Sequence, residues 1–184
     1  MTICNAFAID ELQLRIIYSI IVAGKSASFA KKAIHRLFPV ETGETPFEVI
    51  RSFVRSGHLR SHLESSRTGN YTKIERALEE LSTSEIDLAT CTVDELEAVH
   101  GIGPKTARFF ILWTRPDSRY AALDVHILRW LRKQGYDVPK STPSGKKYAE
   151  IEKLFLSLAD RIGMKPSELD AKIWADSSQK RRTT

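Results

Sequence analysis

The stretch that decides the fold is Gly101-Ile102-Gly103-Pro104-Lys105-Thr106-Ala107, which is followed by Leu123-Asp124-Val125-His126-Ile127. Before it, Thr92-Val93-Asp94-Glu95 has the spacing of a capping box, which predicts a short helix to about residue 99. Gly101 and Gly103 end that helix and permit backbone angles that are closed to other residues. Pro104 suits the first turn of a second helix, to about residue 113, because its missing N–H is not needed there.

Two short helices joined by such a turn leave backbone N–H groups unpaired at a helix N-terminus, which is a site for anions. Lys105 adds a positive charge one residue into the helix. We therefore expect the turn to hold a nucleic-acid phosphate. The residues predicted to contact this phosphate are Gly101, Ile102, Gly103, Lys105, Thr106 and Arg108. The alternative is a helical hairpin in which the glycines are only caps.

Asp124 precedes apolar residues at helical spacing, which predicts that it is the N-cap of the next helix. A plain N-cap stabilises a helix by about 1 kcal/mol, and this structural role is the alternative to a chemical one. The hairpin turn nearby favours the chemical role, because it brings an amine and a carboxylate into one motif.

The turn and the Leu-Asp-Val-His-Ile-Leu segment together resemble the helix-hairpin-helix DNA glycosylase superfamily, strongly over residues 88–131 and weakly in the flanks. The pattern is most similar to archaeal-type 8-oxoguanine DNA glycosylase/AP lyases. Cys4 and Cys91 are too few for the four-cysteine iron–sulfur cluster of the endonuclease III branch. The resemblance implies an all-α, two-lobed fold with a central cleft that receives an extruded base.

The same resemblance implies a bifunctional DNA glycosylase/AP lyase that excises a damaged or modified base, with 8-oxoguanine a candidate. Lys105 is then the nucleophile that forms a Schiff base with the sugar. Asp124 stabilises positive charge on the sugar and accepts a proton. Helix-dipole, Arg108 and burial effects are expected to lower the pKa of Lys105 from its usual value.

A base pocket is the weakest part of the resemblance. Lys25 and Ser26 are expected to line it on one side, with Asp170 and Trp174 across from them. The alternative is that Gly24 and Ser26 only break two helices and that Trp174 is a core residue.

Two other functions are compatible with the sequence. In the first, the chain is a non-catalytic helix-hairpin-helix DNA-binding protein and Asp124 is only a cap. In the second, a glycosylase-like scaffold modifies bases instead of removing them, as in phage enzymes that transfer amino acids or polyamines to activated thymine.

Charge favours an anionic partner, because the 184 residues carry a formal net charge of +5 and a pI near 9.2. The expected partner is double-stranded DNA with an extruded base, bound by a monomer. Residues 51–67 form a second basic run, which is either a solvated face or DNA-facing. His58 and His62 lie in that run without a third ligand, so no metal site is expected. No cofactor is expected either, although the resemblance implies a monovalent cation at the hairpin.

Hydrophobic spacing predicts further helices over residues 10–22, 26–38, 46–54, 71–81, 146–161 and 166–174, with Trp113 and Trp130 in the core. Residues 1–176 are expected to form one glycosylase-like unit. Its central lobe would span about 40–132, its second lobe about 1–39 with 133–176, and a flexible basic tail would cover 177–184. The apolar segment 16–23 is too short to span a bilayer, and no targeting segment is evident, so a cytoplasmic location with DNA is expected.

Overall fold

The computed structural model describes residues 7–38 and 43–179, and every regular element in these ranges is an α-helix. This confirms the all-α prediction. The chain forms two compact units, Met1–Gly103 and Pro104–Thr184, and each is described by itself below. The predicted lobe boundaries and the cleft between lobes stay predictions.

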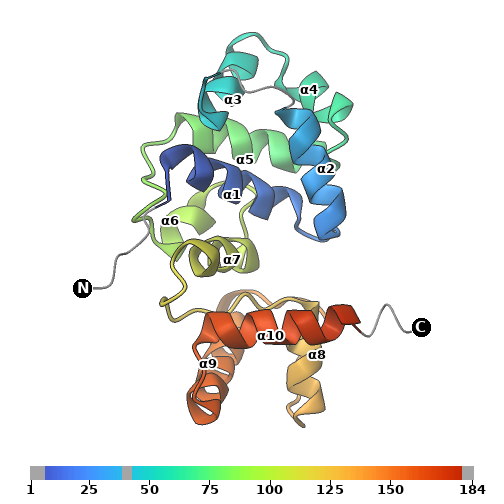
Figure 1. Ribbon diagram of the computed structural model, residues 1–184, viewed down its shortest axis with the longest axis vertical. Coiled ribbons are helices and arrows are strands. Elements are labelled where there is room, and N and C mark those ends of the chain that lie inside the picture. Colours follow the sequence, from blue (N-terminus) through green and yellow to red (C-terminus); the bar gives the residue numbers. More distant parts are fainter. Residues whose placement is uncertain (1–6, 39–42, 180–184) are drawn as a thin grey trace. The chain divides into compact units, whose positions relative to one another are not determined.

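The first unit is built around one helix, α5, which packs against α1, α3 and α4 (Figure 1). Residues at helical spacing supply the buried faces, with Ile16, Ile50, Leu63 and Leu78 fully buried. The described helices of this unit are α1 (Ile9–Ile21), α2 (Ala27–Leu37), α3 (Pro46–Arg55), α4 (Leu59–Ser65), α5 (Tyr71–Thr83) and α6 (Val93–Ala98).

The predicted capping box at the start of α6 is confirmed. The Thr92 hydroxyl accepts a hydrogen bond from the Glu95 N–H at 3.2 Å, and the Glu95 carboxylate accepts one from the Thr92 N–H at 2.7 Å. These two bonds satisfy donors that the helix itself leaves unpaired. They fix the start of the helix that leads into the hairpin turn.

Helix α4 was not expected, because its seven residues are rich in Ser, His and Arg and carry only Leu59 and Leu63 as a buried pair. It lies within the basic run 51–67. The His62 ring stacks on Phe53 with centroids 3.9 Å apart, and its Nε2 lies 2.9 Å from the Leu37 carbonyl oxygen. His62 is partly buried and therefore connects three helices of the first unit.

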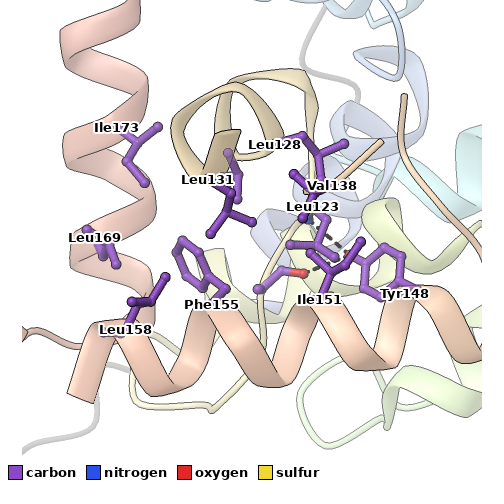
Figure 2. Close-up of a cluster of buried hydrophobic side chains, with 13 residues drawn as sticks. Leu123, Leu128, Leu131, Val138, Tyr148, Ile151, Phe155, Leu158, Leu169 and Ile173 are labelled. Carbon is purple, nitrogen blue, oxygen red and sulfur yellow. Dashed lines mark hydrogen bonds between the residues drawn. The ribbon is translucent and has the colours of Figure 1, made fainter. Parts of the chain in front are cut away.

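The second unit contains α7 (Pro104–Thr114), α8 (Val125–Lys133), α9 (Gly145–Ile162) and α10 (Pro166–Gln179). Helix α10 packs against both α8 and α9, and Figure 2 shows the buried side chains that these three helices contribute. Phe155 of α9 and Leu131 of α8 are completely buried in this cluster, and Leu169 and Ile173 of α10 close it. The cluster includes Leu123 and Ile127, which lie on either side of Asp124 at the start of α8.

Three expectations for the second unit can be compared with the structure. Trp130 packs against the core, edge-on to Phe155 at 6.2 Å, as predicted. Trp113 is 39% exposed, so the core position predicted for it is wrong. Helix α10 continues five residues past its predicted end at Trp174, to Gln179. The remainder of the expected tail, 180–184, lies outside the described residues.

In the part of the chain that the structure describes, no helix combines the length and the apolar character needed to cross a bilayer.

Candidate active site

The hairpin turn begins after α6 at its C-cap residue Val99, whose carbonyl oxygen accepts a hydrogen bond from the Ile102 N–H at 3.1 Å. Gly101 has a φ of +83°, which side chains rarely adopt. Gly103 lies outside this left-handed region, so the expectation that both glycines need special backbone angles is wrong for Gly103. A Cβ at Gly103 would meet no atom within 4 Å. Its missing side chain therefore leaves open space at the end of the hairpin turn.

Lys105 is the second residue of α7 and is partly buried. Its Nζ lies 4.7 Å from the centroid of the Phe109 ring, one helical turn later, which is a cation–π contact. Burial lowers the pKa of Lys105 below its ordinary value, while the negative charges of Asp124 and Asp170 oppose that shift. The side chain thus has the environment of an amine that gives up its proton more readily than an exposed lysine does.

Asp124 is the N-cap of α8, as predicted. Its Oδ1 accepts hydrogen bonds from the His126 N–H at 2.8 Å and from the Ile127 N–H at 3.0 Å. None of the described residues hydrogen-bonds to the other carboxylate oxygen, Oδ2. The cap and a chemical role are therefore compatible, because one oxygen fixes the carboxylate while the other remains available to a ligand.

Tyr148 of α9 holds the backbone that leads to Asp124. Its hydroxyl donates to the Ala121 carbonyl at 2.7 Å and accepts from the Leu123 N–H at 3.0 Å, the dashed lines in Figure 2. The Thr142 hydroxyl donates to the Leu123 carbonyl at 2.9 Å. These bonds satisfy the backbone polar groups of residues 121–123, a buried segment without secondary structure. Asp124 is therefore held by this segment before it and by its N-cap hydrogen bonds after it.

Asp170 of α10 interacts electrostatically with both Lys105 and Asp124. Burial and the negative charge of Asp124 together raise the pKa of Asp170 to about 7, against the opposing positive charge of Lys105. The ring of Trp174, one turn later and 44% exposed, lies edge-on to the His126 ring at 5.8 Å. The second unit therefore brings Asp170 and Trp174 to the N-terminal end of α8, close enough for Asp170 to interact with both Lys105 and Asp124.

Arg108, expected to contact phosphate, points into the second unit. Its Nε donates to Glu152 Oε1 at 2.8 Å, and both side chains are almost buried. The guanidinium also lies 4.5 Å from the centroid of the Tyr148 ring. Glu152 Oε1 accepts a second hydrogen bond from the Ala121 N–H at 2.8 Å, so this ion pair connects α7 and α9 to the segment before Asp124.

Thr106 is 4% exposed, which leaves little of its surface for the phosphate contact expected of it. Lys25 and Ser26 lie in the first unit. The Ser26 hydroxyl caps α2 by accepting from the Phe29 N–H at 3.2 Å, and the Lys25 ammonium donates to the Thr68 carbonyl. The structure says nothing about where these two residues lie relative to Asp170 and Trp174, because the two units are described separately.

Sequence reasoning missed two features of this site. Phe109 was not singled out, although its spacing of four residues from Lys105 would have indicated a contact along one face of the helix. Asp170 was expected only in a base pocket, and no local signal indicated that its charge interacts with Lys105 and Asp124 from another helix. Among the described residues, no group of three or more His, Cys, Asp or Glu side chains is arranged to hold a metal ion.

The sequence is similar to that of proteins with established names. Residues 10–164 match a protein-family model described as 8-oxoguanine DNA glycosylase. An 8-oxoguanine DNA glycosylase/AP lyase of Methanocaldococcus jannaschii is 40% identical over 78 residues, which is 41% of this chain and 37% of that protein. A protein of the same name from Thermoplasma volcanium is 39% identical over 79 residues, 43% of this chain and 37% of that relative. The aligned stretch thus spans little more than a third of each relative, and no solved structure matches.

Proposed function

Because this chain belongs to the 8-oxoguanine DNA glycosylase family, we propose that it is a bifunctional DNA glycosylase/AP lyase that removes 8-oxoguanine or a similarly damaged base. One observation carries the proposal: the second unit groups a lysine whose pKa burial lowers with an N-cap carboxylate that keeps one oxygen available. The names of the relatives support 8-oxoguanine as the first substrate to test.

The proposed reaction begins after the damaged nucleotide has left the duplex, because the glycosidic carbon is inaccessible in stacked DNA. The neutral amine of Lys105 attacks C1′ of the deoxyribose. The bond from C1′ to the base breaks, and the base leaves with the bonding electrons. Asp124 Oδ2 faces the positive charge that develops on the sugar and lowers the energy of that state.

The nitrogen, now bonded to C1′, gives one of its two protons to Asp124. Its lone pair then forms a C=N bond as the C1′–O4′ bond breaks and O4′ takes that proton from Asp124, which gives a protonated Schiff base between Lys105 and C1′. Removal of a proton from C2′ allows the 3′ phosphate to leave and cuts the strand. Asp124 accepts the proton that Lys105 releases, because it is a carboxylate held in the same part of the unit.

Two binding roles complete the proposal, one for phosphate and one for the extruded base. The backbone N–H groups at the start of α7 hold a DNA phosphate, with Lys105 and the open space at Gly103 beside them. Arg108 contributes less than expected, because Glu152 occupies its guanidinium. Asp170 and the exposed face of Trp174 contact the extruded base. Contacts of Lys25 and Ser26 with that base, and a monovalent cation at the hairpin, stay predictions on which no step depends.

Borohydride trapping tests the proposal, since it reduces a Schiff base to a stable amine. Duplexes carrying 8-oxoguanine, uracil, alkylated purines or oxidised and hypermodified pyrimidines are assayed separately for base release, strand scission and covalent trapping. We expect Lys105→Gln to abolish trapping, while Lys153→Gln, which changes an exposed lysine of α9, leaves it unchanged. Asp124→Asn should slow base release by roughly a thousandfold while DNA affinity stays within a few-fold.

Other results would identify the alternatives. An adduct that forms equally well with Lys105→Gln would remove Lys105 as the nucleophile. Binding to every duplex without release of any base would leave a DNA-binding protein in which Asp124 is only a cap. Transfer of a group to an activated pyrimidine without an abasic product would indicate base modification.

A further inference from the structure

Helix α5 packs against the hairpin turn within the first unit. A Cβ at Gly101 would lie 2.9 Å from Lys73 Cγ and 3.1 Å from the Lys73 carbonyl oxygen, so only a glycine permits this close approach. Two turns later on the same helix, the Glu80 carboxylate accepts a hydrogen bond from the His100 N–H at 2.9 Å. His100 and Gly101, which are consecutive in the turn, therefore both contact one face of α5.

This packing also fixes the position of the Lys73 side chain. Lys73 Cε lies 3.4 Å from the position that a Cβ would take at Gly101. The ammonium nitrogen is bonded directly to this Cε. The charge therefore lies beside the turn. Lys73 is exposed, and it forms no ion pair with any residue in the described ranges. Arg15 and Arg60 of the same unit, by contrast, are paired with Glu11 and with Glu64 and Glu75.

A second lysine adds to the positive potential at this edge of the first unit. The Lys25 ammonium donates to the Thr68 carbonyl and lies 5.2 Å from the centroid of the Phe29 ring. Burial lowers the pKa of Lys25, and the positive charge of Lys73 lowers it further. Two like charges held near each other repel, and an anion bound at them relieves that repulsion. Glu80, the acid that hydrogen-bonds to the turn, is already engaged with the His100 N–H.

We propose that Lys73 binds a phosphate of the DNA backbone next to the hairpin turn, and that Lys25 strengthens this contact. The proposal rests on the proposed function, because it requires that the hairpin turn faces DNA. It adds a phosphate contact on α5 to those of the hairpin itself. Since a phosphate contact carries no sequence information, its role is to fix the register of the duplex.

Salt-dependent binding tests this contact apart from catalysis. Affinity for an undamaged duplex and for a duplex with an abasic-site analogue is measured by fluorescence anisotropy from 50 to 300 mM KCl. For Lys73→Gln we expect the slope of log affinity against log salt to fall by about 0.9, the value for one phosphate contact. Lys25→Gln should change the slope less. The matched control Lys32→Gln removes an exposed charge from α2 and should leave the slope unchanged.

The outcomes separate this contact from the catalytic proposal. With enzyme in excess over DNA, Lys73→Gln should still give the wild-type yield of borohydride adduct. Equal slopes for Lys73→Gln and Lys32→Gln would overturn the phosphate contact. So would a loss of affinity that comes with a lower unfolding temperature and no change in slope. A reduced slope in a protein that releases no base would support the contact while the glycosylase proposal fails.

Discussion

An exposed lysine is almost fully protonated at neutral pH, because its ordinary pKa is about 10.4, and a protonated amine cannot attack a sugar. Burial of Lys105 against Phe109 shifts the pKa in the direction that chemistry requires. The two nearby carboxylates act in the opposite direction. Asp170 limits that opposition, because a carboxyl whose pKa is about 7 is largely neutral below that pH. Protonation of Asp170 therefore removes a negative charge that stabilises the ammonium of Lys105, which favours the neutral amine.

The raised pKa of Asp170 also predicts how stability depends on pH. Below about pH 4 the carboxyl is protonated in both the folded and the unfolded chain. Between about pH 4 and pH 7 only the unfolded chain ionises, so the contribution of Asp170 to the free energy of unfolding falls as pH rises. Asp170→Asn cannot ionise, so we expect it to be more stable than wild type above pH 7 and nearly equal at pH 4.

Urea unfolding at pH 4, 5.5, 7 and 8 measures this difference. Asp176→Asn is the matched control, because it removes an exposed carboxylate from the same helix. A constant difference between Asp170→Asn and wild type across this range would contradict the placement of Asp170. Greater stability combined with slower base release would indicate that the acid is retained for function at the expense of stability.

Single residues were predictable where their partners are close in sequence. The role of Asp124 as a cap follows from the apolar spacing after it, and its partners are two and three residues away. Arg108 was assigned to phosphate because it follows the turn. Its partner Glu152 is 44 positions later, and nothing in the local sequence indicates that contact. The coupling of Asp170 to Lys105 is equally remote.

At the level of elements, the two glycines of the hairpin turn have different tasks. Gly101 adopts a left-handed φ against Lys73, whereas Gly103 leaves open space. We expect Gly101→Ala to lower the free energy of unfolding by at least about 1–2 kcal/mol, the usual cost of a left-handed conformation. Gly103→Ala should leave stability unchanged and weaken DNA binding about tenfold or more, because its methyl group would occupy the approach of the phosphate.

Thermal unfolding and fluorescence anisotropy of both variants distinguish these tasks. Wild-type affinity of Gly103→Ala would show that no phosphate approaches the turn closely. An unchanged unfolding temperature of Gly101→Ala would contradict the predicted loss of stability and would show that α5 shifts to make room for the added methyl group.

The segment before α8 provides a second prediction at this level. The Tyr148 hydroxyl makes two buried hydrogen bonds to that segment, so Tyr148→Phe leaves the Ala121 carbonyl and the Leu123 N–H without this partner. We expect a loss of about 1–3 kcal/mol in the free energy of unfolding. Base release should slow more than DNA affinity falls, since Asp124 follows this segment directly.

Tyr136→Phe is the control, because Tyr136 packs against the same hydrophobic cluster. Base release is measured with enzyme in excess, at a temperature at which both variants remain folded. Equal rates for the two variants would mean that Tyr148 contributes to folding alone and does not position Asp124.

Helices with strong local signals were predicted nearly to the residue. The capping box at Thr92 and the proline at position 104 mark two starts that the structure confirms. Helix α4 lacks both a capping side chain and a long apolar face, so its helical form depends on packing against α3 and α5. The length of α10 was underestimated because Ser and Asp, which favour helix ends, follow Trp174.

The net charge of +5 describes the whole molecule, but not every positive side chain is available to bind DNA. Arg60 and Arg119 are paired with carboxylates of their own units, as Arg108 is with Glu152. The charges that remain near the hairpin turn are lysines without ion pairs in the described ranges. Affinity for DNA should therefore depend on a few local cations and not on the total charge.

This uneven distribution predicts a steep but limited response to salt. If the hairpin turn and Lys73 together engage two or three phosphates, affinity should fall roughly ten- to fortyfold between 50 and 200 mM salt. Arg60→Gln lowers the net charge as much as Lys73→Gln does, yet it should leave this ratio nearly unchanged, because Glu64 and Glu75 already neutralise Arg60. Anisotropy titrations at both salt concentrations measure the ratio. A flat response would contradict binding through phosphates, and equal effects of the two variants would mean that DNA responds to the total charge after all.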